Sequence, residues 1–168
     1  MQAKLEGVRE LRLAIDRKIR EVGDASVKGL QAVGMEIVAE AKTNLRRNRT
    51  NNTGVLSASG KVQKTNDGNV DAGFFSSGSS DGYAASVEYG RGPSARKGAI
   101  PLSQTIKAWV RRKLGVPYGK ELDRAAYLIA RKIHRHGTKP QPFFTPAVEK
   151  VEKKADEIMS KYINEATK

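Results

Sequence analysis

The side chains that most often carry catalysis are few in this sequence, and their spacing does not suit it. The two histidines, His134 and His136, are two positions apart near the end of an expected helix, so their rings point in different directions and do not chelate one metal. Glu88, Glu121 and Asp123 show no paired-carboxylate or metal-loop spacing. The absence of cysteine excludes a thiol nucleophile and a cysteine-ligated metal. We therefore expect a protein that is not an enzyme and that holds no cofactor or metal.

The most pronounced chemical feature of the sequence is its excess of basic residues. Among 168 residues, 31 are lysine or arginine and 18 are aspartate or glutamate, which gives a net charge of +13. Residues 101–136 hold 9 of the basic and 2 of the acidic residues, so more than half of the excess lies there. Such a patch is typical of a surface that binds a polyanion or an acidic protein, and a solvated face that serves solubility is the plainer alternative. The candidate contact residues are Arg111, Arg112, Lys113, Arg131, Lys132 and Arg135.

Hydrophobic residues at three- and four-residue steps predict long amphipathic helices in the first part of the chain. One helix is expected over residues 1–22 and a second over 24–46, with a stop at Gly23 and Asp24 as the N-cap of the second helix. Both helices have a narrow apolar stripe. Each stripe needs a cover, either from the body of the domain or from neighbouring copies.

Alternation with a period of two predicts a small antiparallel sheet after these helices. Residues 61–65 and 70–74 flank an Asp-Gly pair, which is a strong hairpin signal because glycine adopts the positive φ that the turn needs. Similar alternation at residues 83–89 predicts a third strand. The expected fold class is therefore α+β, with a hairpin plus a third strand packed against long amphipathic helices.

Three further helices are expected after the sheet. Two lie over residues 103–115, with Ser103 as the cap, and over 121–135. The closing helix starts at Thr145 as N-cap, with Pro146 at the first helical position. At least one of the two phenylalanines that precede it is expected to anchor this helix to the sheet. The expected domain limits are 1–168 for a single domain, 1–22 for a protruding N-terminal helix and 24–165 for the body.

Three strings of the sequence resemble, in the same order, those of the tail-completion (head–tail joining, or neck) family of long-tailed bacteriophages. They are TGVLSAS at residues 53–59, YAASVEYGRG at 83–92 and GTKPQPFFTPA at 137–147. The family typically shows T-G-x-L-x-x-S, then A-x-x-V-E-[FY]-G, then P-x-P-F-[FL]-x-P-A before a closing helix. The residues of this sequence that carry the resemblance are Tyr83, Val87, Glu88, Tyr89, Gly90, Pro142, Phe143, Phe144 and Pro146.

The resemblance implies a structural protein of the virion neck, assembled in the host cytoplasm and built into a ring of six copies. Its partners would be further copies of itself, the adjacent connector or stopper proteins, and the tail terminator or tail tube. The six basic candidates would face either genomic DNA in the lumen, without sequence preference, or an acidic surface on the adjacent ring. Both possibilities stay open at this point.

Two plainer interpretations stand beside the resemblance. The chain could be a small basic nucleic-acid-binding protein, although its aromatic residues do not interleave with the basic ones as a base-stacking platform requires. The motif side chains could also simply form the core, with Glu88 facing away from them and paired with an arginine. The side chains in this core interpretation are Tyr83, Val87, Tyr89, Phe143 and Phe144. No apolar run approaches the ~18–20 residues of a membrane span, so no membrane association is expected.

Overall fold

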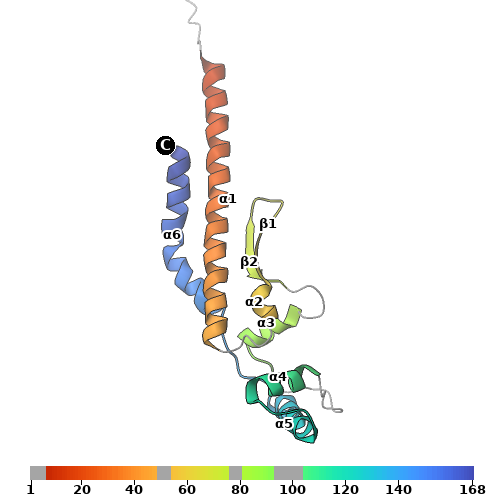
Figure 1. Ribbon diagram of the computed structural model, residues 1–168. Coiled ribbons are helices and arrows are strands. Elements are labelled where there is room, and N and C mark those ends of the chain that lie inside the picture. Colours follow the sequence, from red (N-terminus) through yellow and green to blue (C-terminus); the bar gives the residue numbers. More distant parts are fainter. Residues whose placement is uncertain (1–6, 49–53, 76–80, 93–103) are drawn as a thin grey trace, which may run out of the picture. The chain divides into compact units, whose positions relative to one another are not determined.

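The computed structural model describes residues 7–48, 54–75, 81–92 and 104–168 (Figure 1). Its elements are α1 (Val8–Arg47), α2 (Val55–Ala58), β1 (Gly60–Lys64), β2 (Val70–Phe74), α3 (Asp81–Glu88), α4 (Gln104–Leu114), α5 (Lys120–His136) and α6 (Thr145–Thr167). Within these ranges β1 and β2 form one antiparallel sheet, and the remaining regular structure is helical. The α+β class is confirmed.

The chain divides into two compact units. The first, which we call the helix–hairpin unit, comprises residues 1–44, 59–75 and 144–168 and so contains most of α1, the two strands and α6. The second comprises residues 45–58 and 76–143 and contains α2 to α5. We call it the basic unit because it holds most of the excess positive charge of the chain.

Helix α1 is continuous, so the predicted stop at Gly23 and the predicted N-cap at Asp24 are wrong. A glycine inside a helix costs only about 1 kcal/mol relative to alanine, and tertiary packing readily offsets this amount. The turn after Asp24 provides such packing, because Ala25 is buried and Gly29 lies against α6. A Cβ atom at Gly29 would be 2.7 Å from the sulfur of Met159. Glycine therefore allows a close approach of the two helices.

Helix α6 runs antiparallel to α1. Lys150 Nζ lies 2.9 Å from Glu40 Oε1, and Lys18 Nζ donates a hydrogen bond of 2.7 Å to the carbonyl oxygen of Ala166. The helix begins at Thr145 with Phe144 as N-cap, so the predicted N-cap is wrong by one residue. A proline in the first turn is tolerated there because the first N–H groups of a helix have no intrahelical acceptor.

The predicted hairpin is confirmed, with Val62 opposite Ala72 in the register of β1 and β2. Gly68 in the turn has φ +78°, as an Asp-Gly hairpin requires. The hairpin packs on α1 at Gly34, where a Cβ atom would lie 3.1 Å from the Cβ of Ala72 and 3.2 Å from a methyl group of Val62. Figure 1 shows α6 and the hairpin on different sides of α1. Phe144 meets Phe74 of β2 edge-to-face, with 6.1 Å between ring centroids, so the predicted aromatic anchor of α6 is confirmed.

The predicted third strand is wrong, because residues 81–88 form helix α3. The helical pattern continues to Tyr89, whose N–H donates to the carbonyl oxygen of Ala85 at 2.9 Å. The alternation that suggested a strand spans only a few positions, and short apolar patterns do not separate helix from strand. Ala84 and Ala85 favour helix by intrinsic propensity.

Helices α4 and α5 confirm two of the three helices predicted after the sheet. They share a core formed by Val110, Leu122 and Ala126, against which Ile106, Trp109, Val116, Ala125 and Ile129 pack. These residues recur at helical spacing in both segments, which is why the sequence pattern located the helices correctly. The predicted cap Ser103 lies outside the described residues. The single-domain limits, and the protruding helix over residues 1–22, stay predictions.

Candidate interaction surface

Two of the three sequence strings meet in the basic unit, although about 50 residues separate them in the chain. Arg91 and Thr138 exchange backbone hydrogen bonds of 3.1 and 2.8 Å in an isolated antiparallel bridge. The N–H of Gln141 donates to the carbonyl oxygen of Val87 at 2.8 Å. We call residues 87–92 and 137–143 together the clasp. The second and third strings therefore mark two distant segments of the chain that are hydrogen-bonded to each other.

Glu88, the carboxylate of the second string, holds the clasp together from inside. It is buried, and its Oε2 atom accepts a hydrogen bond of 2.8 Å from the backbone N–H of Phe143. Asn48, the residue after α1, donates from its Nδ2 atom to the carbonyl oxygen of Pro142 at 3.0 Å and so fixes the same segment of the clasp. A buried backbone N–H group needs an acceptor, and the carboxyl group of Glu88 supplies it. The sequence analysis expected an arginine as the partner of Glu88. The structure shows a backbone N–H group as a partner, which the sequence did not indicate.

Two glycines allow the two halves of the clasp to approach each other. Gly90 has φ +74° and Gly137 has φ +73°, a region that other residues adopt only at a cost. A Cβ atom at Gly137 would lie 1.8 Å from the carbonyl oxygen of Arg91, and one at Gly90 would lie 2.6 Å from that of Thr138. Gly90 belongs to the motif residues, whereas Gly137 was not among them. The sequence offered one signal for a positive φ at Gly137, namely its place directly after the last turn of a helix.

The aromatic motif residues do not behave alike. Phe143 is only 1% exposed, as the core interpretation expected, and Val87 and Phe144 are half-buried. Tyr83 and Tyr89 are 48% and 76% exposed, so the core interpretation is wrong for both tyrosines. Large exposed aromatic side chains are enriched where proteins bind one another. Pro142 and Pro146 are exposed as well.

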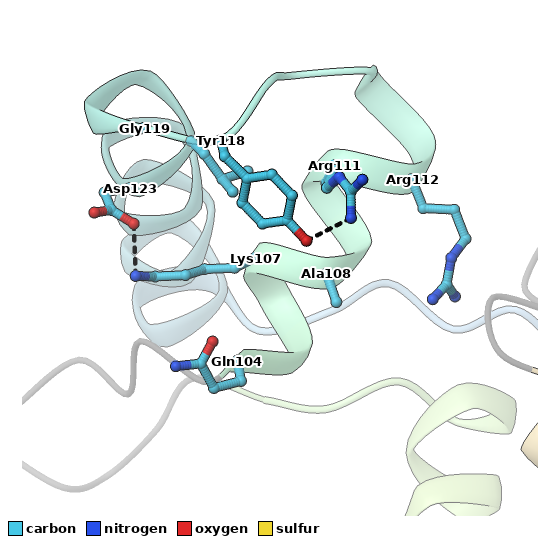
Figure 2. Close-up of a pocket in the computed structure, with 9 residues that line it drawn as sticks. Gln104, Lys107, Ala108, Arg111, Arg112, Tyr118, Gly119 and Asp123 are labelled. Carbon is cyan, nitrogen blue, oxygen red and sulfur yellow. Dashed lines mark hydrogen bonds and ion pairs between the residues drawn. The ribbon is translucent and has the colours of Figure 1, made fainter.

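Three of the six basic candidates lie in the last turn of α4, and two of them, Arg111 and Arg112, line a cleft of about 680 Å³ (Figure 2). The guanidinium group of Arg111 lies 4.1 Å from the ring centroid of Tyr118 and also donates a hydrogen bond to its hydroxyl group. Lys107 forms an ion pair with Asp123 across the same cleft. Arg112 lines the cleft and Lys113 is exposed. Much of the positive charge at this end is therefore engaged with partners in the same unit.

The other three candidates lie near the opposite end of α5. Lys132 lines a second cleft of about 560 Å³, Arg135 is exposed and Arg131 is half-buried. Lys132 is nine positions after Asp123 of the first cleft, which is about 14 Å along a helix. The structure thus divides the predicted basic cluster into two patches.

The charge of the protein is segregated between its two units. The basic unit contains 16 lysine and arginine residues and 4 acidic residues, a net charge of +12, whereas the helix–hairpin unit carries +1. No acidic residue occurs from 89 to 120 or from 124 to 148. The basic segment seen in the sequence is thus part of a larger basic surface, because residues on both sides of it fold into the same unit.

The described residues offer no group of three or more histidine, cysteine, aspartate or glutamate side chains that could hold a metal ion. Among the described helices, none is long and apolar enough to cross a membrane.

A comparison with known families identifies the class of protein to which this arrangement is related. Residues 10–90 match a protein-family model, HK97-gp10_like, described as "Bacteriophage HK97-gp10, putative tail-component". The match covers just under half of the chain and confirms the resemblance to a phage tail-component family. It includes the first two strings, up to Gly90, while the third string lies outside it and joins the second through the clasp. No curated protein and no solved structure matches the chain.

Proposed function

We propose that this protein is a neck subunit of a tailed bacteriophage. Six copies form a ring that completes the tail and joins it to the head connector around the path of the DNA. The neighbours of the ring are connector or stopper proteins on one face and the tail terminator or tail tube on the other. Assembly takes place in the host cytoplasm. The family match over residues 10–90 supports the class, and the surface of α1 supports the ring.

The observation that carries the ring is an apolar stripe on the first half of α1. Val8, Leu11, Ile15 and Ile19 follow one another at steps of three and four residues, and each is between 50% and 65% exposed. Every residue from 7 to 21 is exposed. Burying one such side chain is worth about 1.5–3 kcal/mol. A neighbouring copy in a ring would cover this stripe, which the sequence pattern left without a cover.

The stripe is tested by replacing Leu11 and Ile15 together with serine. The matched control is Leu13→Ser, since Leu13 is 58% exposed but lies on the opposite side of the helix. We expect all variants to melt like the parent, because substitutions on an exposed surface change stability by only about 0.5 kcal/mol. We expect the double variant to lower the yield of infectious particles at least about tenfold in a phage that depends on this chain. The control should keep the parental yield.

Equal yields from the double variant and the control would show that the stripe does not take part in assembly. The ring proposal would then lose its support.

For the basic unit we propose docking on an acidic surface of the adjacent ring, in preference to contact with DNA in the lumen. A ring in this position must recognise protein on both faces, whereas DNA needs only a passage. Charged groups in such a docking set orientation and encounter rate. Contacts with sliding DNA would instead be sequence-blind phosphate contacts that weaken with salt.

Reversal of charge at Lys113 and Arg135 separates these two roles. Both side chains are exposed, one in each basic patch, whereas Arg111 is tied to Tyr118 and its replacement would disturb the fold. With docking, the variant Lys113→Glu/Arg135→Glu is expected to produce full heads and separate tails that do not join, visible by electron microscopy. Lys61→Glu on the exposed face of β1 is the control and should give joined particles. Joined particles that lose or fail to eject DNA would contradict docking and favour the lumen.

A further inference from the structure

The second cleft, between α5 and the clasp, has the composition of a binding site for negative charge. Four basic side chains line this clasp cleft: Arg91, Lys132, His136 and Lys139. Among the described residues, no aspartate or glutamate lines it. Its volume of about 560 Å³ falls within the range of ligand-binding clefts.

The basic side chains of the clasp cleft differ in their contacts from those in Figure 2. In the cleft at the end of α4, Arg111 stacks on Tyr118 and Lys107 pairs with Asp123. In the clasp cleft, by comparison, none of the four basic side chains has an ion pair or a side-chain hydrogen bond within the part of the chain that the structure describes. A concave surface with several unpaired cations raises the local concentration of anionic groups.

The remaining walls of the clasp cleft are apolar. Ile129 and Ile133 of α5 and Pro140 of the clasp contribute them, and Tyr89 stands at the cleft with 76% of its surface exposed. Tyrosine and arginine are the residue types that most often dominate protein–protein binding energies. The walls are also fixed in advance, because the bridge between Arg91 and Thr138 holds one side of the cleft. A preformed site loses less entropy on binding.

We propose that the clasp cleft binds an acidic segment of a neighbouring virion protein, with carboxylates on Arg91, Lys132 and Lys139 and an apolar side chain against Ile129, Ile133 and Tyr89. The inference rests on the proposed docking function and names the chemistry of the partner. Duplex DNA fits less well, since its phosphates lie on a convex surface and contribute no apolar group to the floor of the cleft. Aromatic residues and arginine are enriched in protein interfaces, where a polar rim surrounds an apolar centre.

The experiment uses the full chain labelled with ¹⁵N and three probes followed by NMR. The first probe is an acetylated and amidated pentapeptide with leucine between two pairs of aspartates. The second replaces every aspartate with asparagine, and the third is a short duplex DNA. We expect the acidic peptide to shift the amide signals of Ile133 and Thr138 in a saturable manner, and the neutral peptide to leave them in place.

Two charge reversals on α5 locate the site. Lys132→Glu should weaken binding of the acidic peptide about tenfold or more, because a charged hydrogen-bond partner is lost. Arg124→Glu makes the same change in net charge on an exposed residue outside both clefts and should stay within about twofold of the parent.

Three results would overturn the inference: equal binding of the two peptides, equal losses in the two variants, or DNA that shifts the cleft signals while the acidic peptide does not. None of these depends on ring formation. A result against peptide binding in the clasp cleft is therefore distinguishable from a result against the neck function. The particle yields of the α1 variants test the neck function separately.

Discussion

Replacing Gly137 with alanine is expected to lower the free energy of unfolding by about 3 kcal/mol or more, a large share of the 5–15 kcal/mol of a typical domain. The added Cβ atom would lie 1.8 Å from the carbonyl oxygen of Arg91, which is backbone and cannot swing aside. With ψ −161°, this positive φ lies in a region that essentially only glycine adopts, which alone costs alanine about 1–3 kcal/mol. The displaced strand would also lose the two hydrogen bonds between Arg91 and Thr138, each worth about 1 kcal/mol.

Gly115→Ala is the matched control for this prediction, measured by urea unfolding of the full chain. Gly115 has φ +67°, but no atom lies within 4 Å of the position of its Cβ atom. It should therefore show only the cost of the backbone conformation, about 1–2 kcal/mol. If Gly137→Ala is no more destabilising than Gly115→Ala, the clasp does not depend on the close approach of the Arg91 backbone to Gly137.

The second large effect is expected at Phe143. Its side chain is 1% exposed, and truncation of a buried phenylalanine to alanine costs about 3–5 kcal/mol. Phe143→Ala should therefore lower the melting temperature by many degrees, whereas Phe75→Ala, at a side chain that is 41% exposed, should have a much smaller effect. Phe144→Ala is expected to lie between the two, since this half-buried ring loses its edge-to-face contact with Phe74.

Thermal unfolding of the three variants checks the order of these effects. Melting of both Phe143→Ala and Phe144→Ala within a degree or two of the parent would show that neither ring anchors the structure.

Elements with strong local signals were predictable from the sequence. The hairpin followed from alternation around Asp67 and Gly68, and α4 and α5 followed from apolar residues at helical spacing. The continuity of α1 was not predictable in this way, because packing of Gly29 against Met159 supports the turns that follow Gly23. Helix α3 was missed because its short alternation of apolar residues is compatible with both a helix and a strand. The segment that it contacts also lies about 50 residues later in the chain, where no local pattern reveals it.

The interaction surface was predictable in its parts but not in its arrangement. The strings around Glu88 and Phe143 were visible, whereas the hydrogen bond between these two residues depends on tertiary folding. The basic segment was likewise visible, yet its division between a partly neutralised cleft and the clasp cleft depends on the positions of Tyr118 and Asp123. Arg91 and Lys139 lie outside that segment and join Lys132 only through the clasp.

The family strings thus have a structural meaning within this chain. Glu88 and Gly90 belong to the residues that resemble phage tail-completion proteins, and both act in the clasp by allowing or forming contacts with the third string. The clasp in turn forms one wall of the cleft that we propose to receive an acidic partner.

The central claim, a ring of six copies in the neck, is tested most directly by a reconstruction of the intact phage particle by electron cryomicroscopy. We expect six copies of this chain between the head connector and the tail, with the stripe of Leu11 and Ile15 covered by a neighbouring copy. Density for this chain in the capsid faces or in the tail fibres would contradict the account.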